Sequence, residues 1–276
     1  MIQANLRALE SPSPYPDRAL GANREWGYSR EGGTAMGRSW SCAGGLLVAA
    51  VIAVHGAPGV AGTSTPEDVA ERISVQEAAS ARVEAGGKIV YFDPFFDEKT
   101  PAPAADLILI THGHERHCEA EIVARILKPE TTIVAPESCA RALRDVAKRP
   151  ITTPVPGQAV QLAGLTVEPV PAYTPDHADH PRETGGVGYV LTIDGVRIFH
   201  SGSTALVPEL KELRADIALI AFWDGYILGT EDAAALARSL GATFVFPIHC
   251  KPEEAVKLRD ALQPAIRVFI KDRPQT

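Results

Sequence analysis

The chain has 276 residues, of which 45% are hydrophobic and 22% are charged, so it can build one sizeable core. Its formal net charge is −7, and no cluster of lysine or arginine is long enough to form a surface for nucleic acid. These properties are consistent with one globular domain and argue against nucleic acid as a partner.

The first sixty residues differ from the rest of the chain. Residues 1–35 contain prolines and glycines without an apolar period, and we predict a disordered extension or an incorrectly assigned start, with Met36 as the first residue. Residues 36–61 are typical of a signal peptide, because Arg38 precedes the apolar segment Ala43–Val54 and small residues follow. We therefore expect a periplasmic or secreted protein. An uncleaved membrane anchor and a buried element of the fold remain alternatives, although a span needs about 20 apolar residues.

Strands and helices alternate from residue 62 onward. The segment Glu67–Ala85 is mixed and is predicted to be partly helical. The next part of the chain predicts strands at Lys88–Asp93, Asp106–Thr111 and Thr132–Ala135, and helices at Glu119–Leu127 and Pro136–Ala147. This alternation favours sheets that are covered by helices.

Short strands dominate the middle of the chain, and alternation returns in the last third. The pair Asp194-Gly195 predicts a hairpin turn between two of the strands. Strands are predicted at Val155–Leu162, Leu165–Val170, Val187–Ile193, Val196–His200, Ile217–Phe222, Phe244–Ile248 and Ile266–Ile270. Helices are predicted at Thr230–Leu240, with Thr230 as the N-cap, and at Pro252–Leu262.

Residues 111–117 read Thr-His-Gly-His-Glu-Arg-His, directly after an apolar run. Three imidazoles within six residues are difficult to explain by packing, and imidazole is the commonest protein ligand for zinc. The stretch nearly matches the two-metal hydrolase motif His-x-His-x-Asp-His, but Arg116 stands where that motif has aspartate. Further histidines fall at strand ends or in one loop, namely His177, His180, His200 and His249.

From about Val83 to Ile270 the chain resembles the metallo-β-lactamase superfamily, and within it the lactonase-like and Zn-dependent hydrolase branch. The resemblance implies an α/β fold, an αββα sandwich in which two mixed sheets are flanked by helices, over residues 62–276. The matching stretches occur in the family's order: Tyr91-Phe92-Asp93-Pro94, Ile110-Thr111-His112-Gly113-His114, Val170-Pro171-Ala172-Tyr173, Gly188-Tyr189-Val190, Ile198-Phe199-His200-Ser201-Gly202 and Phe246-Pro247-Ile248-His249.

The resemblance also implies a set of metal ligands. His112 and His114 match two ligands of the first metal, and the third comes from the loop after Tyr173, where we favour His180 over His177. His117 and His249 match two ligands of the second metal. Asp93 resembles the carboxylate that orients a ligand histidine from outside the coordination sphere.

Two departures from the family pattern affect the second metal. Arg116 replaces its carboxylate, and Ser203 replaces the bridging carboxylate. Because arginine stays protonated, it is not a ligand, and we expect one zinc ion rather than two. Arg116 then either binds an anionic group of the substrate or a developing oxyanion, or pairs with Glu115, Asp176 or Asp179.

In the family, an aspartate that faces the metal-bound water transfers protons during hydrolysis, and this chain lacks it. His117 and His249 are predicted to carry protons in its place, with Ser203 nearby. The expected function is hydrolysis of a small ester, lactone, amide or phosphoester by a zinc-activated water. The alternative is a degenerate member of the fold that binds a ligand or partner without turnover.

Several residues near the expected site admit a structural explanation. Cys118, Cys139 and Cys250 are odd in number, so we expect buried cysteines rather than a disulfide framework. His200 is predicted to be a buried histidine that bonds to the backbone. Trp223 and Tyr226 either line a pocket or pack in the core.

Overall fold

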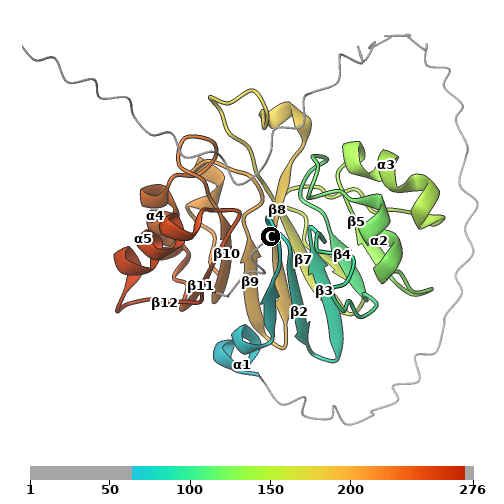
Figure 1. Cartoon of the computed structure of the whole chain (residues 1–276), viewed down its shortest axis with the longest axis horizontal. Coiled ribbons are helices and arrows are strands. Elements are labelled where there is room, and N and C mark those ends of the chain that lie inside the picture. The colour runs from blue at the N-terminus through green and yellow to red at the C-terminus, as the bar shows by residue number, and fades with distance from the viewer. Residues whose placement is uncertain (1–63, 271–276) are drawn as a thin grey trace, which may run out of the picture. The chain divides into compact units, whose positions relative to one another are not determined.

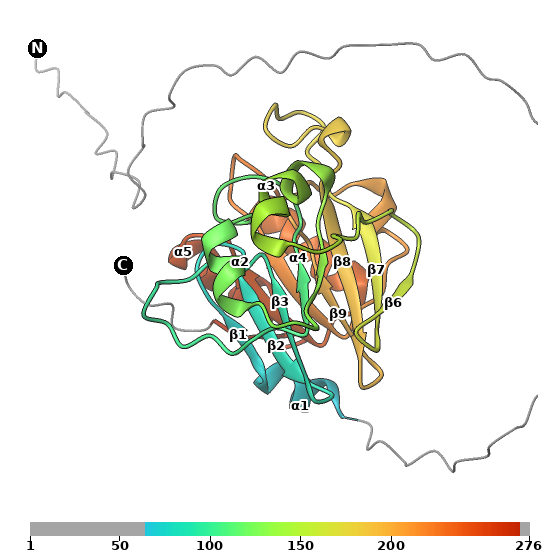
Figure 2. The same cartoon turned by 90° about the vertical axis from the view of Figure 1, so that its right-hand side faces the viewer.

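The structure is a computed structural model that describes residues 64–270, so the extension and signal-like segment predicted at 1–61 lie outside the described residues. Two sheets pack face to face, with α2 and α3 outside the first sheet and α4 and α5 outside the second (Figures 1 and 2). The main core lies between the sheets and contains side chains from both. The predicted αββα sandwich is therefore confirmed. No helix within residues 64–270 is long and apolar enough to cross a membrane.

The first sheet has five strands in the order β1-β2-β3-β4-β5. Strands β1 to β3 pair antiparallel, whereas β3, β4 and β5 pair parallel. The bounds are β1 Ile73–Val75, β2 Ala81–Ala85, β3 Lys88–Phe92, β4 Leu107–Leu109 and β5 Thr132–Val134. Helices α2 (Ala120–Ile126) and α3 (Glu137–Ala147) bury their apolar sides against its outer face in a second cluster.

The second sheet has seven strands in the order β12-β11-β10-β9-β8-β7-β6, antiparallel from β6 to β9 and parallel from β9 to β12. Asp194 and Gly195 both have positive φ at the β8–β9 hairpin, as a type I′ turn requires. The strands are β6 Val160–Leu162, β7 Leu165–Pro171, β8 Val187–Ile193, β9 Val196–His200, β10 Ile217–Ala221, β11 Phe244–Ile248 and β12 Arg267–Val268. The helices are α4 Thr230–Leu240 and α5 Pro252–Leu262, with short 3-10 turns η1 Arg182–Thr184 and η2 Pro208–Leu210.

The structure confirms that Glu67–Ala85 is partly helical and refines two other sequence predictions. Within that segment α1 (Pro66–Glu71) is followed by β1 and β2, whose buried and outward side chains alternate. The predicted strands at Val155–Leu162 and Ile266–Ile270 shrink to β6 and β12.

Thr230 is not the N-cap of α4, because Gly229 occupies that position. The Asp224 carboxylate, six residues earlier in the chain, accepts hydrogen bonds from the Thr230 N–H and hydroxyl at 2.6 and 3.0 Å and so caps the start of α4.

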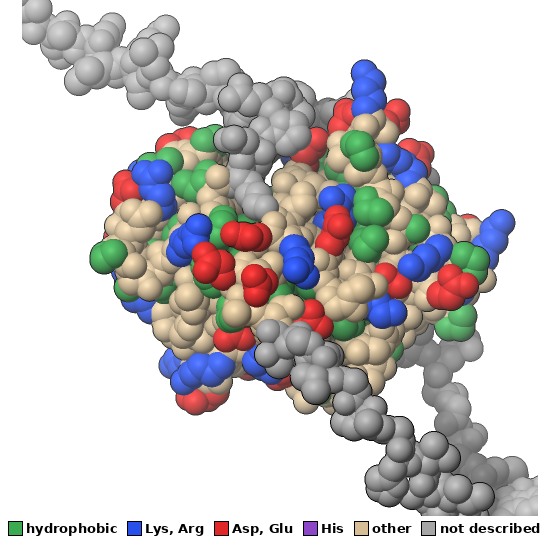
Figure 3. All heavy atoms as spheres, turned by 90° about the horizontal axis from the view of Figure 1, so that it is seen from below, with side chains coloured by type: hydrophobic (Ala, Val, Ile, Leu, Met, Phe, Trp, Pro, Cys, Tyr) green, Lys and Arg blue, Asp and Glu red, His purple; other side chains and the backbone are tan. Residues whose placement is uncertain are grey.

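The fold gathers the polar residues of interest at one edge. The parallel strands β3, β4, β9, β10 and β11 end at this edge, and His112 and His249 follow β4 and β11. On the face seen from below, acidic and basic side chains are mixed and histidines do not gather (Figure 3). The strand ends therefore bring together residues as far apart in sequence as His112 and His249, and this edge is the candidate site.

Candidate metal centre

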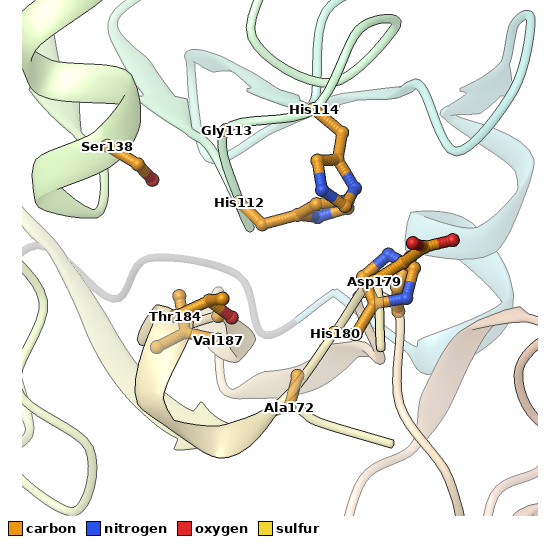
Figure 4. A pocket seen from close by; sticks show the side chains of 11 residues that line it. His112, Gly113, His114, Ser138, Ala172, Asp179, His180, Thr184 and Val187 are labelled. Carbon is orange, nitrogen blue, oxygen red and sulfur yellow. The ribbon is translucent and has the colours of Figure 1, made fainter. Parts of the chain in front are cut away.

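Three histidine side chains meet at this edge. His112, His114 and His180 each offer a ring nitrogen, and these atoms lie within 4.8 Å of one another. Their ring centres are 4.8, 5.1 and 4.9 Å apart, and Figure 4 shows the rings pointing toward one another. Of the two histidines that the sequence left open, the structure brings His180 to this group.

His177 lies outside the group. Its Nδ1 is 3.7 Å from the Asp179 carboxylate, and its ring contacts Tyr226 at 4.8 Å. Residues 174–180, which contain both histidines, form a closed loop, because the Thr174 N–H donates to the His180 carbonyl at 2.8 Å. This closure directs His180 inward and leaves His177 on the outer side.

Gly113 allows the loop that carries two of the histidines to approach α3. A Cβ at this position would lie 2.7 Å from the Ser138 hydroxyl, which is closer than a side chain tolerates. The loop therefore packs against the first turn of α3, and His112 and His114 are held on either side of the contact.

The buried nitrogens of this group fit a metal ion. Neither Nε2 of His112 nor Nδ1 of His180 has a hydrogen-bond partner within the described residues, although both atoms are buried. Leaving such a group without a partner costs about 1–3 kcal/mol, so a ligand is expected there. Three imidazoles with room for a fourth ligand are the donor set of a catalytic zinc site.

The protonation state of these histidines also suits a metal. Burial holds the pKa of His112 well below its usual value, and the neighbouring histidines lower it further. Burial and then His114 lower the pKa of His180 to about 4. Both rings are therefore neutral near pH 7, as coordination requires.

Asp93 fixes the orientation of two histidines. Its buried carboxylate accepts from the Thr111 N–H at 2.7 Å, the Thr111 hydroxyl at 2.6 Å and His117 Nδ1 at 2.7 Å. Because the Thr111 hydroxyl donates to Asp93, it accepts from His112 Nδ1 at 2.9 Å, which leaves Nε2 of His112 with its lone pair toward the site. Burial raises the pKa of Asp93 to about 6, so the carboxylate is mostly ionised at pH 7.

His117 and His249 lie beside the three-histidine group. The His117 ring is 4.0 Å from that of His112 and stacks on His249 at 5.4 Å. Asp93, His112 and His117 also form a group with metal-ligand spacing, but Asp93 already accepts the hydrogen bond from His117. His249 belongs to neither such group of the described residues.

Comparison with known proteins identifies the family. A model of the beta-lactamase superfamily domain matches residues 72–249, which is more than half of the chain. The chain belongs to the metallo-β-lactamase superfamily. It also belongs to the UPF0173 metal-dependent hydrolases, since it is 31% identical to one from Methanoculleus marisnigri over 63% of this chain and 78% of the relative. A second relative, from Methanoregula boonei, is 32% identical over 62% and 78%.

Solved structures of the superfamily show the same fold. A protein from Parabacteroides distasonis that is named as a metal-dependent hydrolase has 29% identity and a TM-score of 0.65, with 72% of this chain and 91% of that one aligned. Igni18, a metallo hydrolase from Ignicoccus hospitalis, shares the fold at 20% identity and a TM-score of 0.57, over 72% and 94% of the two chains.

The two positions that depart from the superfamily pattern have different surroundings. The Arg116 guanidinium lies 5.9 Å from the centre of the Phe95 ring, and Arg116 lines neither of the two cavities at the site. Ser203 is only 4% exposed and lines both cavities. Ser203 therefore lies at the site, whereas the Arg116 guanidinium lies against Phe95.

Two cavities flank the three-histidine group. The smaller, of about 130 Å³, lies toward α3 and is lined by residues that include Ser138, Asp179 and Thr184. The larger, of about 430 Å³, is lined by Trp223, Tyr226, Glu115, Asp224, His117 and His249 as well as the group itself. Trp223 and Tyr226 thus line a pocket, which was one of the two explanations that the sequence allowed.

Sequence analysis missed Glu115 and Asp224 as site residues. Both line the larger cavity, Glu115 from the loop between His114 and Arg116 and Asp224 from the segment after β10. For Glu115, its position in the sequence between His114 and His117 was the one feature that could have indicated a place at the site.

His200 has the structural role that the sequence predicted. Its Nε2 donates to the Ala79 carbonyl at 2.9 Å, its Nδ1 accepts from the Gly202 N–H at 3.2 Å, and its ring stacks on Phe92. Both nitrogens are used, so His200 supports the strand ends and is confirmed as a buried histidine bonded to the backbone.

One disulfide forms that the sequence did not predict, so Cys118 is not the unpaired buried cysteine that was expected. Cys118 and Cys139 are joined, and the bond links the residue after His117 to the first turn of α3. The two positions are 21 residues apart, and neither strand pattern nor cysteine count indicates that the loop returns to this helix. Cys250 is buried.

Replacing both Cys118 and Cys139 by serine is expected to destabilise the fold by about 3 kcal/mol, because the open loop gains entropy in the unfolded chain. Denaturant unfolding of the double variant under oxidising conditions measures this loss. Dithiothreitol should destabilise the wild type by a similar amount and leave the double variant unchanged. Equal stability of the oxidised wild type and the double variant would contradict the prediction.

Proposed function

We propose that the protein is an exported hydrolase with one zinc ion at His112, His114 and His180, and that it acts on a small ester, lactone, amide or phosphoester. The observation that carries the proposal is the pair of buried ring nitrogens, His112 Nε2 and His180 Nδ1, that converge without partners. Membership of the metal-dependent hydrolases supports hydrolysis, and an all-imidazole donor set supports zinc.

The chain's own residues hold and orient the reacting groups. His112, His114 and His180 would hold a divalent ion, which would supply Lewis-acid chemistry for hydrolysis. The chain from His112 through Thr111 to Asp93 fixes the His112 ring, so that its Nε2 faces the cavities. The hydrogen bond between His117 Nδ1 and Asp93 likewise leaves His117 Nε2 as a proton acceptor.

His249 and Ser203 complete the proposed site. His249 stacks on His117 and lines the larger cavity, where it can accept or deliver a proton. Ser203 lines both cavities, where its hydroxyl can orient a reacting oxygen. Since Arg116 and Ser203 replace two carboxylate ligands, a second ion lacks the ligands that would hold it tightly.

The disulfide supports the proposed export. Disulfides persist in the periplasm and outside the cell but are rare in the cytosol. The bond between Cys118 and Cys139 fits the signal-like segment at 36–61.

Metal removal tests the proposed function. The full-length protein is assayed against a panel of esters, lactones, amides and phosphoesters before and after dialysis with a chelator. We expect hydrolysis of at least one class, its loss in the metal-free protein and its recovery with added zinc. A zinc-loaded protein that hydrolyses nothing in the panel would contradict the proposal and favour a degenerate member of the fold.

Replacing His249 by alanine is expected to lower kcat by about 100-fold or more, because it removes a proton carrier. Bound metal should stay at the wild-type level, since His249 is not one of the three ligands. Elemental analysis and steady-state kinetics on the same preparation separate the two effects. Unchanged turnover would exclude His249 from proton transfer, and loss of metal would make it a ligand.

A further inference from the structure

We propose that the substrate carries a positively charged group, such as an ammonium, on the side that occupies the larger cavity. This inference rests on the proposed hydrolase function and specifies its substrate class. It starts from the charges that line the site, because the ligand histidines are neutral and do not themselves select a charge.

The lining of the two cavities is acidic. Glu115 and Asp224 line the larger cavity and Asp179 lines the smaller, and within residues 64–270 no lysine or arginine lines either one. These three carboxylates outnumber the two positive charges of a divalent ion. An anionic substrate would meet repulsion here, whereas a cationic group would find carboxylates to pair with.

Two aromatic rings form the wall next to these carboxylates. Trp223 and Tyr226 both line the larger cavity, with ring centres 6.1 Å apart and planes at 65°. Aromatic faces attract cations and commonly bind quaternary ammonium groups. Lys251 Nζ already lies 5.7 Å from the Trp223 ring, although Lys251 does not line the cavity.

Arg116 is the residue that an anionic substrate would need. Its guanidinium lies over the Phe95 ring, and Arg116 lines neither cavity. The hypothesis that Arg116 holds a substrate carboxylate or phosphate therefore lacks support from the geometry.

Buried polar atoms mark the same cavity as a place where a ligand binds. His112 is 7% exposed and Ser203 is 4% exposed, and both line the larger cavity. Within the described residues, His112 Nε2 has no hydrogen-bond partner. The reacting carbonyl therefore lies beside the three-histidine group, where the two cavities meet, with the charged group toward Trp223 and a small acyl group in the cavity of about 130 Å³.

A pair of isosteric esters tests the charge preference directly. Acetylcholine and 3,3-dimethylbutyl acetate differ only by nitrogen in place of carbon, and 4-acetoxybutanoate supplies a negative charge. In each case water adds its hydroxyl to the acyl carbon, the acyl C–O bond breaks, and the leaving alcohol takes a proton. With the full-length metal-loaded protein we expect kcat/KM for acetylcholine to exceed that of its neutral isostere by about tenfold at low salt. The preference should shrink as salt is added.

Equal or slower hydrolysis of acetylcholine would overturn the inference while leaving the hydrolase function in place. Calorimetric binding of choline and 3,3-dimethylbutanol gives a second measurement that needs no turnover. Tighter binding of choline supports the inference even if no ester in the panel is hydrolysed, an outcome that would count against the proposed function alone. Equal binding of the two alcohols would overturn the inference.

A variant places the preference on the cavity. Glu115→Gln removes one lining charge and should lower the ratio of the two kcat/KM values by about threefold. Glu121→Gln, in the exposed first turn of α2, is the matched control and should leave the ratio unchanged. A ratio that does not change in Glu115→Gln would overturn the role of this carboxylate.

Discussion

Replacing His180 by alanine is expected to remove most of the bound metal and to lower hydrolysis by more than about 100-fold. Mutating a residue that only hydrogen-bonds to a metal ligand already lowers metal affinity or activity by up to about 100-fold, and His180 is itself a ligand. His180 supplies one of three ring nitrogens that lie within 4.8 Å of one another, and its own Nδ1 is buried without a partner. Two histidines alone leave an ion with too few protein ligands for a stable site.

His177→Ala is the matched control for this prediction. The two histidines lie in the same loop, three positions apart, but His177 pairs with Asp179 and lines neither cavity. Elemental analysis and kinetics on both variants should show loss in His180→Ala and wild-type values in His177→Ala. The reverse pattern would make His177 the third ligand.

The double substitution Arg116→Asp with Ser203→Asp is expected to raise the metal content from about one to about two ions per chain. It restores the two carboxylates that the superfamily pattern supplies, at position 203, which lines both cavities, and at position 116, next to His117 in the sequence. Arg116 has a φ of 67°, a conformation that aspartate adopts more readily than arginine, so the backbone should accept the change.

The double amide variant Arg116→Asn with Ser203→Asn is the control, because it matches the new side chains in size and lacks their charge. Elemental analysis after equilibration with excess metal should give two ions per chain for the aspartate variant and one for the amide variant. One ion in both would show that the missing carboxylates do not limit the second site.

The fold and the ligand group were largely predictable because their signals are local. A few neighbouring residues are enough to predict a strand end or a hairpin. Examples are the apolar run before Thr111, the histidines of residues 111–117 and the Asp194-Gly195 turn. Glu67–Ala85 is partly helical as predicted, but its strands β1 and β2 were not predicted, because their alternation shows only once both faces of the sheet are known.

The remaining features depend on contacts between distant segments. The disulfide between Cys118 and Cys139 forms because α3 packs against Gly113, which no pattern in either segment indicates. Sequence spacing also placed Arg116 among the site residues, whereas its guanidinium lies over the Phe95 ring and Glu115 lines the larger cavity.

The central claim is that His112, His114 and His180 hold one catalytic ion and that the second site has lost the ligands it needs. Elemental analysis of the purified full-length protein, after equilibration with excess zinc and removal of unbound metal, tests it most directly. The account predicts one ion per chain. Two ions per chain, or none, would contradict it.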